Sequence, residues 1–567
     1  MHPLRWVRRH VTALGLTLAA LGFWWFEALY GFTPTLDGFV LAQAWRVRMG
    51  EIPHVDFTSP RPLGSALLHL PEAMLGTGML AGSRLVVTMQ LLVIAVAFVR
   101  SGSQRPLRRL TFASLAVLAF MLDVGDWPVI AWHTIDGLFL AALAFELARA
   151  ARTRPGWRWG LMWFLAGAAP LVKQGFVIVP VMVAIELLRH ERVRVWRWMP
   201  MLLAPAVLFL WWVRPGPAAL ANQLVGPTSG NLPSLLVPLQ ALAQGTMLLS
   251  LAYAALCALL ALRFAETHRF GSWVRTTVAL FLLLAPTLAL GYSANFARSS
   301  GWAFVPFASY CAIAAARWWR RHDDDLVLQV LGLLLLGYAT TVSWAVPTPS
   351  LVAGVVLARS VLLLPLFDHR DGEPEESAGA GAQRHLQRIA SVGLVVAALT
   401  GTGLVTNARA VAPFLDVPRW AMTSQVDLPT MRGIHVSPQL AAFENSLIGC
   451  VRKYPARWVA VAPVGAAQYP LLGLRNPFGI DWWLPPEVPE DHLARVVAVL
   501  QRLNASGDYL VLQETVAPMA LASMSVAEVT TPAADLLPAP GYDALLNGLQ
   551  GQPVTCGSFV GKYAPAH

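Results

Sequence analysis

The stretch TLDGFVLAQAWRVRMGEIPHVDF, residues 35–57, gathers acids, bases and a histidine in a chain that is otherwise strongly apolar. Its apolar residues recur at helical spacing, at Leu36, Val40, Ala44 and Val47. This spacing predicts an amphipathic helix over 36–49 that lies at a membrane surface, with Asp37 in its first turn. A carboxylate there is favoured by the helix N-terminus and stays ionised, which suits a general base or a metal ligand. The alternative is that Asp37 only caps the helix.

The same stretch ends in a second group of polar side chains, around His54 and Asp56. Asp56 could position a substrate or bind a divalent cation such as Mg²⁺ or Mn²⁺, because these ions prefer hard oxygen ligands. His54 is the neighbouring candidate for substrate binding. The alternative for Asp56 is a salt bridge to Arg61.

A second polar stretch, LDVGDWPVIAWHTID at 122–136, lies between two apolar runs. It holds three acids, one histidine and no base, namely Asp123, Asp126, Asp136 and His133. Asp126 could supply a second catalytic carboxylate opposite Asp37. The alternative is an acid-rich turn that faces water.

These candidate side chains must be positioned by a membrane protein. The 567 residues are 56% hydrophobic and 13% charged, with a mean hydropathy of +0.54, whereas soluble domains carry about 25% charged residues. Apolar runs of spanning or near-spanning length predict a polytopic α-helical protein with about thirteen transmembrane helices, the shorter ones tilted or extended by neighbouring residues. The expected ranges are 11–30, 82–99, 110–123, 136–150, 160–172, 175–188, 198–213, 241–262, 276–292, 301–316, 326–345, 351–367 and 389–407.

Arginines supply almost all of the net charge of +10, since the only lysines are Lys173, Lys453 and Lys562. The arginine clusters each fall after an even number of expected spans. The positive-inside rule therefore places these clusters and the N-terminus in the cytoplasm. The basic charge is therefore a topology signal and does not imply a nucleic-acid partner. An odd number of spans predicts a transmembrane domain at 1–407, with a periplasmic loop at 31–81, and an exported domain at 408–567.

The exported segment has the pattern of a small α/β domain. RWVAVAP at 457–463 and DYLVLQE at 508–514 are predicted to be buried strands. Residues 488–507 have helical spacing, acids in the first turn and a glycine at the end. Cys450 and Cys556 lie in the same segment, and an oxidising compartment would allow them to pair. The alternative is two free buried thiols.

A turn-rich segment of this domain, LRNPFGIDWWLPPE at 474–487, combines aromatic rings with Asp481. Aromatic faces beside an acid can hold a sugar ring, with Trp482 as the candidate contact. The same composition can dock a loop onto a membrane surface. The sequence leaves both alternatives open.

Taken in order, an apolar span, LDG, an amphipathic helix, GEIPHVDF, SPRPL and another apolar helix resemble the first periplasmic loop of the integral-membrane GT-C glycosyltransferases. This superfamily includes protein mannosyltransferases and the aminoarabinose transferases of lipid A. The stretch LAGAAPLVKQGFVIVP at 165–180 is similar to a lysine-containing turn between two spans in the same bacterial families. Many members carry two adjacent acids at the first position, whereas here Gly38 follows Asp37. That departure leaves the second carboxylate and any dependence on Mg²⁺ or Mn²⁺ open.

The resemblance implies a mechanism and a location. GT-C enzymes take sugars from polyprenyl phosphates in the membrane, here the bacterial inner membrane, and invert the anomeric carbon. Asp37 would accept the proton of a hydroxyl on a glycan, lipid or protein acceptor. Lys173, Gln174 and Arg298 would bind the departing lipid phosphate. The alternatives are a lysine that reaches the membrane interface and an ordinary surface arginine.

Two other classes of function stay open. A transporter or flippase of a lipid-linked saccharide would use Lys173 and Arg359 to line a path, but many transporters show related halves, and the chain shows no long-period repeat. A non-catalytic scaffold would leave the charge-rich first loop without a special role. The chain lacks a Walker loop and the G-x-G-x-x-G and H-E-x-x-H motifs, so neither nucleotide hydrolysis nor a nucleotide-sugar donor is predicted.

Overall fold

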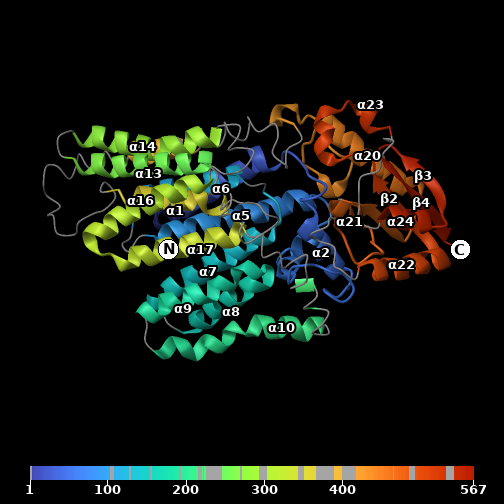
Figure 1. Cartoon of the computed structure of the whole chain (residues 1–567), viewed down its shortest axis with the longest axis horizontal. Helices are drawn as coiled ribbons and strands as arrows, with labels where there is room; N and C mark the ends of the chain where they lie inside the picture. Colours follow the sequence, from blue (N-terminus) through green and yellow to red (C-terminus); the bar gives the residue numbers. More distant parts are fainter. Residues whose placement is uncertain are drawn as a thin grey trace.

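Two parts of the chain lie at opposite ends of the molecule in Figure 1, helices of the first part in blue to yellow and the C-terminal segment in orange to red, with helix α2 (Phe39–Arg48) between them. This computed structural model describes residues 3–102, 107–126, 129–153, 156–190, 193–214, 220, 223–224, 245–267, 271–292, 303–341, 350–364, 389–396, 398, 417–463, 465–483, 492–531 and 542–566.

Helices build the first part, because a long apolar segment satisfies its own backbone hydrogen bonds in this form. Within the described residues, helices lie in each of the apolar ranges expected from the sequence. The ranges 241–262, 301–316, 326–345, 351–367 and 389–407 are described only in part. These elements are α1 (Pro3–Phe23), η1 (Trp24–Ala28), α5 (Met79–Ser101), α6 (Arg109–Asp126), α7 (His133–Thr153), α8 (Trp157–Val172), η2 (Gln174–Val177), α9 (Ile178–His190), η3 (Val193–Leu202), α10 (Ala204–Val213), α13 (Gly245–Glu266), α14 (Ser272–Tyr292), α16 (Phe304–Arg321), α17 (Asp324–Thr341), η5 (Ser350–Val352) and α18 (Ala353–Leu362).

Within the described residues, four helical segments are long and apolar enough to cross a membrane, namely His10–Ala28, Met79–Ser101, Trp196–Val213 and Met247–Glu266. Shorter apolar helices lie at Gln174–Leu188, Trp273–Thr287 and Ala353–Leu362. By length and composition, the described helices thus support fewer membrane spans than the thirteen expected from the sequence. One reason is internal charge, since α7 carries Asp136, Glu146 and Arg149 among its apolar residues.

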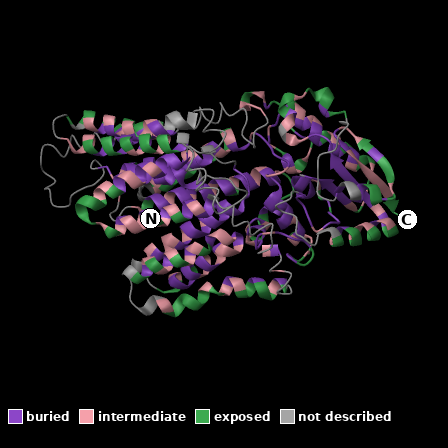
Figure 2. Cartoon of the chain, viewed as in Figure 1, coloured by how far each residue is buried: buried purple, intermediate pink, exposed green. Residues whose placement is uncertain are grey.

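The first loop contains three short helices, α2, α3 (Gly64–Leu68) and α4 (Leu70–Ala73). Helix α2 lies within the predicted range 36–49, but most of its ten residues are buried. It packs against η8 (Gly465–Ala467) and α21 (Gln468–Leu472) of the C-terminal part, where Figure 2 shows buried residues between the two parts. The prediction that this helix lies on a membrane surface is therefore wrong, because its apolar residues meet protein.

The C-terminal part is a small α/β unit around a four-stranded sheet of order β1-β2-β4-β3. Strands β1 (Trp458–Ala462) and β2 (Gly507–Glu514) are parallel, and helix α22 (His492–Ser506) precedes β2. This arrangement confirms the predicted strand, helix and strand. The antiparallel hairpin of β3 (Gln552–Cys556) and β4 (Phe559–Ala566) was not predicted from the sequence. The remaining elements are η6 (Arg419–Ala421), η7 (Pro429–Met431), α20 (Pro438–Lys453), η10 (Pro518–Ser523), α23 (Val526–Val529) and α24 (Tyr542–Gly548).

A disulfide joins Cys450 of α20 to Cys556 of β3, with a Cα–Cα distance of 5.6 Å. It answers the question that the sequence left open between a disulfide and two free thiols. The bond closes a loop with a sequence separation of 106 residues, and it thus restricts the unfolded chain and stabilises the fold. Such bonds are typical of oxidising compartments.

One hydrophobic cluster extends from the helices through α2 into the C-terminal part. It contains Phe39 and Val40 of α2 together with Leu91 of α5, Leu440 of α20 and Leu510 of β2. Burial of apolar surface is the main force that holds protein parts together in water. The first loop is therefore a buried layer between the two parts of the molecule.

Candidate functional site

Asp37 is buried, and both of its carboxylate oxygens are engaged. The Arg84 guanidinium of α5 donates to them from Nη2 at 2.9 and 3.1 Å and from Nε at 3.3 Å. The backbone N–H of Thr33 donates to Oδ2 at 2.8 Å. Arg84 also donates to the carbonyls of Ala28 and Gly31, each at 2.7 Å. Asp37 therefore fastens the start of the first loop to α5, and its role as a general base stays a prediction.

Gly38 explains why a second acid does not follow Asp37. Gly38 occupies the N-cap position of α2, and no side chain caps the helix there. Asp37 therefore does not cap α2. A Cβ atom at position 38 would lie 1.9 Å from the Cα of Ala467. The N–H of Ala467 donates to the carbonyl of Pro34 at 3.1 Å. The close approach of the C-terminal part thus requires glycine at this position.

Arg46 connects α2 to the C-terminal segment around residues 476–483. Its Nε donates to Asp481 at 2.8 and 2.9 Å, its Nη1 to Glu51 at 2.5 Å, and its Nη2 to the carbonyl of Phe478. Burial opposes the charge of Arg46, but Asp481 and Glu51 outweigh this effect and raise its pKa. Asp481 is thus engaged in an ion pair between the two parts.

Trp482 is buried beside Asp481. Its ring lies 4.6 Å from that of Phe39 and 6.4 Å from that of Trp132. The segment that the sequence could place on a membrane surface docks instead onto the first loop and the residues before α7. A contact of Trp482 with a sugar stays a prediction.

His54 and Asp56 are not brought to the same place. His54 is buried, with Nδ1 2.7 Å from Oε1 of Gln223, while Nε2 of Gln223 donates to the His54 carbonyl at 3.0 Å. Burial lowers the pKa of His54. Asp56 is exposed, and its Oδ2 accepts a bond from the N–H of Ile52 at 2.6 Å. His54 therefore holds the loop against Gln223, and Asp56 closes a turn.

Lys173 and Gln174 lie between α8 and α9. Lys173 is buried, and its Nζ donates to Thr134 Oγ1 at 3.1 Å and to the carbonyls of Ala339 and Thr340 at 3.2 and 3.4 Å. Its side chain does not reach outward to an interface, because it joins α7 to α17. Gln174 donates to the carbonyl of Pro60 at 2.6 Å and so holds the first loop.

The amino end of α7 is where buried side chains from several elements meet. His133, its first residue, stacks on Trp132 at 4.6 Å and meets the ring edge of Phe39 at 5.7 Å. Arg61 lies over the ring of Phe39 at 5.2 Å. Arg61 and Lys173 are both close enough to His133 to repel a positive charge on it. The site thus combines two basic side chains and a histidine with aromatic walls, and burial and Arg61 lower the pKa of Lys173.

One turn further along α7, Asp136 belongs to a buried chain of polar groups. Its Oδ1 lies 3.0 Å from His69 Nε2 and accepts a bond from Gln90 of α5 at 2.9 Å. His69 Nδ1 lies 2.9 Å from Glu72 Oε1. Burial opposes protonation of His69, but Asp136 and Glu72 outweigh it and raise its pKa to about 10. The imidazole is therefore a cation between two carboxylates.

His69, Glu72 and Gln90 were not predicted as site residues from the sequence. A signal was present in SALLHLPEA, where His69 and Glu72 are three residues apart and so share one side of a helical turn. Asp136 lies within the second polar stretch, but nothing in its sequence context separated it from Asp126. Its distinguishing feature is the bond to His69, which is distant in sequence.

Two predicted site residues cannot be placed. Arg298 lies outside the described residues, and so does the side chain of Asp126, the last residue of α6. Asp123 accepts a bond from the N–H of Gly354 at 2.8 Å and supports the start of α18. Across the described ranges, no group of three His, Cys, Asp or Glu side chains is arranged to hold a metal ion. The Mg²⁺ or Mn²⁺ ion stays a prediction.

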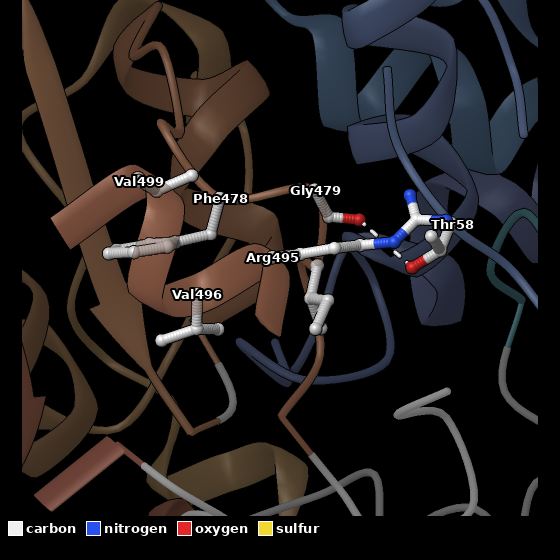
Figure 3. A pocket seen from close by; sticks show the side chains of 7 residues that line it. Thr58, Phe478, Gly479, Arg495, Val496 and Val499 are labelled. Carbon is white, nitrogen blue, oxygen red and sulfur yellow. Dashed lines mark hydrogen bonds between the residues drawn. The ribbon is translucent and has the colours of Figure 1, made fainter. Parts of the chain in front are cut away.

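A shallow recess lies where α22 meets the first loop, and Figure 3 shows its lining. Arg495 extends past Gly479 toward Thr58 (Figure 3). The Thr58 hydroxyl and N–H both donate to the Gly479 carbonyl, at 3.1 and 2.8 Å. The other lining side chains are apolar, namely Phe478, Ile480, Val496 and Val499. The recess lies between packed elements, and no residue of α7 lines it.

Comparison with protein-family models gives no match, and no curated protein is similar enough in sequence to count as a relative. The function must therefore be argued from the residues of this chain.

Proposed function

We propose that the chain is a membrane glycosyltransferase of the GT-C type. It transfers a sugar, with inversion, from a polyprenyl-phosphate donor to a glycan, lipid or protein acceptor on the periplasmic side of a bacterial inner membrane. The observation that carries the proposal is the cluster of Arg61, Lys173 and His133 at the amino end of α7. Arg61 and Lys173 are two basic side chains in one buried place, and an anionic ligand would offset the repulsion between them.

A lipid phosphate fits this cluster chemically. It gains negative charge as the bond to the sugar breaks, and fixed cations in a dry site stabilise that charge more strongly than water does. Lys173 is held by a hydroxyl and two carbonyls, which are neutral acceptors. Burial and the nearby Arg61 lower the pKa of Lys173, and a bound phosphate would favour its charged form again. The N-terminus of α7 adds to the same positive potential.

The membrane setting of the proposal extends what the four apolar helices support. We propose about thirteen spans, with the N-terminus in the cytoplasm and the C-terminal unit in the periplasm. The disulfide between Cys450 and Cys556 fits an exported unit. The first loop would then lie at the outer surface, where a lipid-borne donor and a water-borne acceptor can meet.

The contacts give the transport alternative no specific support. Arg359 donates to the Phe98 carbonyl at 2.9 Å and to the Ser101 hydroxyl at 2.6 Å. These bonds hold Arg359 between α18 and α5.

The test uses the full chain in lipid nanodiscs with a panel of undecaprenyl-phosphate-linked glucose, mannose and arabinose. Because the acceptor is unknown, release of undecaprenyl phosphate is measured with membrane extract or with water as acceptor. Binding of undecaprenyl phosphate is followed by tryptophan fluorescence, since Trp132 and Trp482 border the site.

Lys173→Met and Arg61→Gln should each weaken undecaprenyl phosphate binding at least tenfold, because each removes one cation near the bound phosphate. The exposed Arg432→Gln is the matched control and should leave binding unchanged. A wild-type chain that neither releases undecaprenyl phosphate nor binds it would overturn the proposal. Movement of a fluorescent lipid-linked saccharide across proteoliposomes without turnover would favour the transporter.

A further inference from the structure

We propose that Asp136 is the catalytic residue that accepts the proton of the acceptor hydroxyl, with His69 and Glu72 as its positioning residues. The inference rests on the proposed sugar transfer and concerns the same site. It assigns the proton transfer to the amino end of α7, in place of the start of the first loop.

The first argument is the bonding of the two carboxylate oxygens. Asp136 is fully buried, and its Oδ1 interacts with His69 and Gln90. Its Oδ2 is buried as well and has no hydrogen-bond partner among the described residues. A buried carboxylate oxygen of this kind is costly unless a water or a ligand group donates to it. Asp37 differs, since Arg84 and the N–H of Thr33 engage both of its oxygens.

The second argument is position. Asp136 follows His133 by three residues, so both side chains lie on one side of the first turn of α7. His133 Nε2 is likewise buried without a hydrogen-bond partner in the described part of the chain. The proton acceptor and the cation cluster of Arg61, Lys173 and His133 are therefore one helical turn apart. This spacing leaves the acceptor oxygen and the leaving phosphate on neighbouring parts of one site.

The third argument is the orientation of the carboxylate. His69 and Gln90 hold Oδ1 at 3.0 and 2.9 Å, and Glu72 holds the other nitrogen of His69. A base that is held in place by a second and a third group is a common arrangement in catalytic sites.

The step balances without a further reactant. The acceptor O–H bond breaks, and its proton goes to Oδ2 of Asp136. The acceptor oxygen forms a bond to the anomeric carbon as the bond from that carbon to the phosphate oxygen breaks. The phosphate leaves with the electron pair, and its charge is stabilised by the cation cluster. Water restores the ionised carboxylate afterwards by taking up the proton.

The experiment compares Asp136→Asn with Asp123→Asn in nanodiscs, using the undecaprenyl-phosphate sugars described above. Both variants lose one buried carboxylate, but Asp123 supports α18 and lies outside the proposed site. Asp136→Asn should lower turnover at least 100-fold and leave the dissociation constant for undecaprenyl phosphate within threefold of wild type. Asp123→Asn should keep turnover within threefold.

His69→Asn adds a readout that a purely structural role would not move. His69→Asn should lower turnover at least tenfold and leave the dissociation constant for undecaprenyl phosphate within threefold of wild type, because it removes a group that orients Asp136 Oδ1 but no group of the phosphate site. Asp136→Asn with turnover near wild type, or a His69→Asn chain in which phosphate binding falls as much as turnover, would overturn the inference alone. A wild-type chain inactive with every donor would instead overturn the proposed function on which the inference rests.

Discussion

Asp37 is a buried carboxylate that accepts hydrogen bonds from Arg84 and from the N–H of Thr33. The buried charge of Arg84 is in turn balanced by Asp37. Taking a charge out of water is unfavourable unless opposite charge and hydrogen bonds replace the lost hydration. Arg84 meets this condition with the carboxylate of Asp37 and two backbone carbonyls. The pair joins the first loop to α5, so a loss of activity in an Asp37 variant would not by itself identify a catalytic base.

A double substitution separates the two roles of Asp37. Asp37→Asn alone should destabilise the chain by about 3–5 kcal/mol, because Arg84 stays buried without its anion. Adding Arg84→Met should recover most of that loss in thermal unfolding in detergent. A stable double variant that still releases undecaprenyl phosphate at the wild-type rate would exclude Asp37 as the general base. A stable but inactive one would support the prediction from sequence.

Helix α2 has the sequence pattern of a surface helix, but most of its residues are buried. Its apolar residues Phe39, Val40, Leu41 and Ala42 pack in the core, and Arg46 binds Asp481. The approach to η8 is so close at Gly38 that no side chain fits there. The close approach of the C-terminal part to α2 therefore requires a residue without a Cβ atom at position 38.

Gly38→Ala tests this contact. The new Cβ would meet the backbone of Ala467, so the two parts must shift, at a cost of about 1–3 kcal/mol. We expect a lower midpoint of thermal unfolding and faster proteolysis after residue 408. Gly76→Ala is the matched control, since it lies in the same loop with open space around it. Equal stability of the two variants would contradict the close packing.

Local patterns predicted the elements, but contacts between distant residues decided the site. The periodicity of 488–507 and the apolar runs at 457–463 and 508–514 predicted α22, β1 and β2 correctly, because such patterns report burial along one segment. The spacing around Asp37 could not show that Arg84, forty-seven residues later, engages its carboxylate. The bond of Asp136 to His69 is hidden from sequence periodicity for the same reason.

At the scale of the whole molecule, the first loop couples the helices to the C-terminal unit at several points. Tyr30 stacks on His435 at 4.9 Å, and Arg419 binds Glu27 at 3.1 Å. Together with the contact of Arg46 and Asp481, these links fix the unit over the amino end of α7. A disturbance inside the C-terminal unit should therefore reach the candidate site through the first loop.

Two buried acids of the C-terminal unit, Glu444 and Glu514, make its stability dependent on pH. Burial raises the pKa of Glu444 to about 8, against a smaller opposing effect of its bond with Gln468. Burial and the nearby Glu444 raise the pKa of Glu514 well above its usual range. Both carboxyl groups are therefore protonated in the folded chain near neutral pH, and both would be ionised if the chain were unfolded.

This difference gives stability a defined dependence on pH. Between the unfolded pKa of about 4.5 and the folded pKa of about 8, the folded state holds one more proton at Glu444. Its contribution to the free energy of unfolding should thus be largest below this window and fall by about 1.4 kcal/mol per pH unit as pH rises. Glu444→Gln, which keeps an acceptor for Gln468, should flatten that part of the slope in unfolding curves measured from pH 5 to pH 8.

Exposed Glu528 is the control, because backbone and side-chain bonds from Ser525 lower its pKa and its titration falls below the same window. Glu528→Gln should therefore leave the slope from pH 5 to pH 8 unchanged. Parallel curves for wild type and Glu444→Gln would show that Glu444 is ionised in the folded chain. That result would require a cation or a donor group beside the buried pair, since two uncompensated carboxylates are not stable together in a dry core.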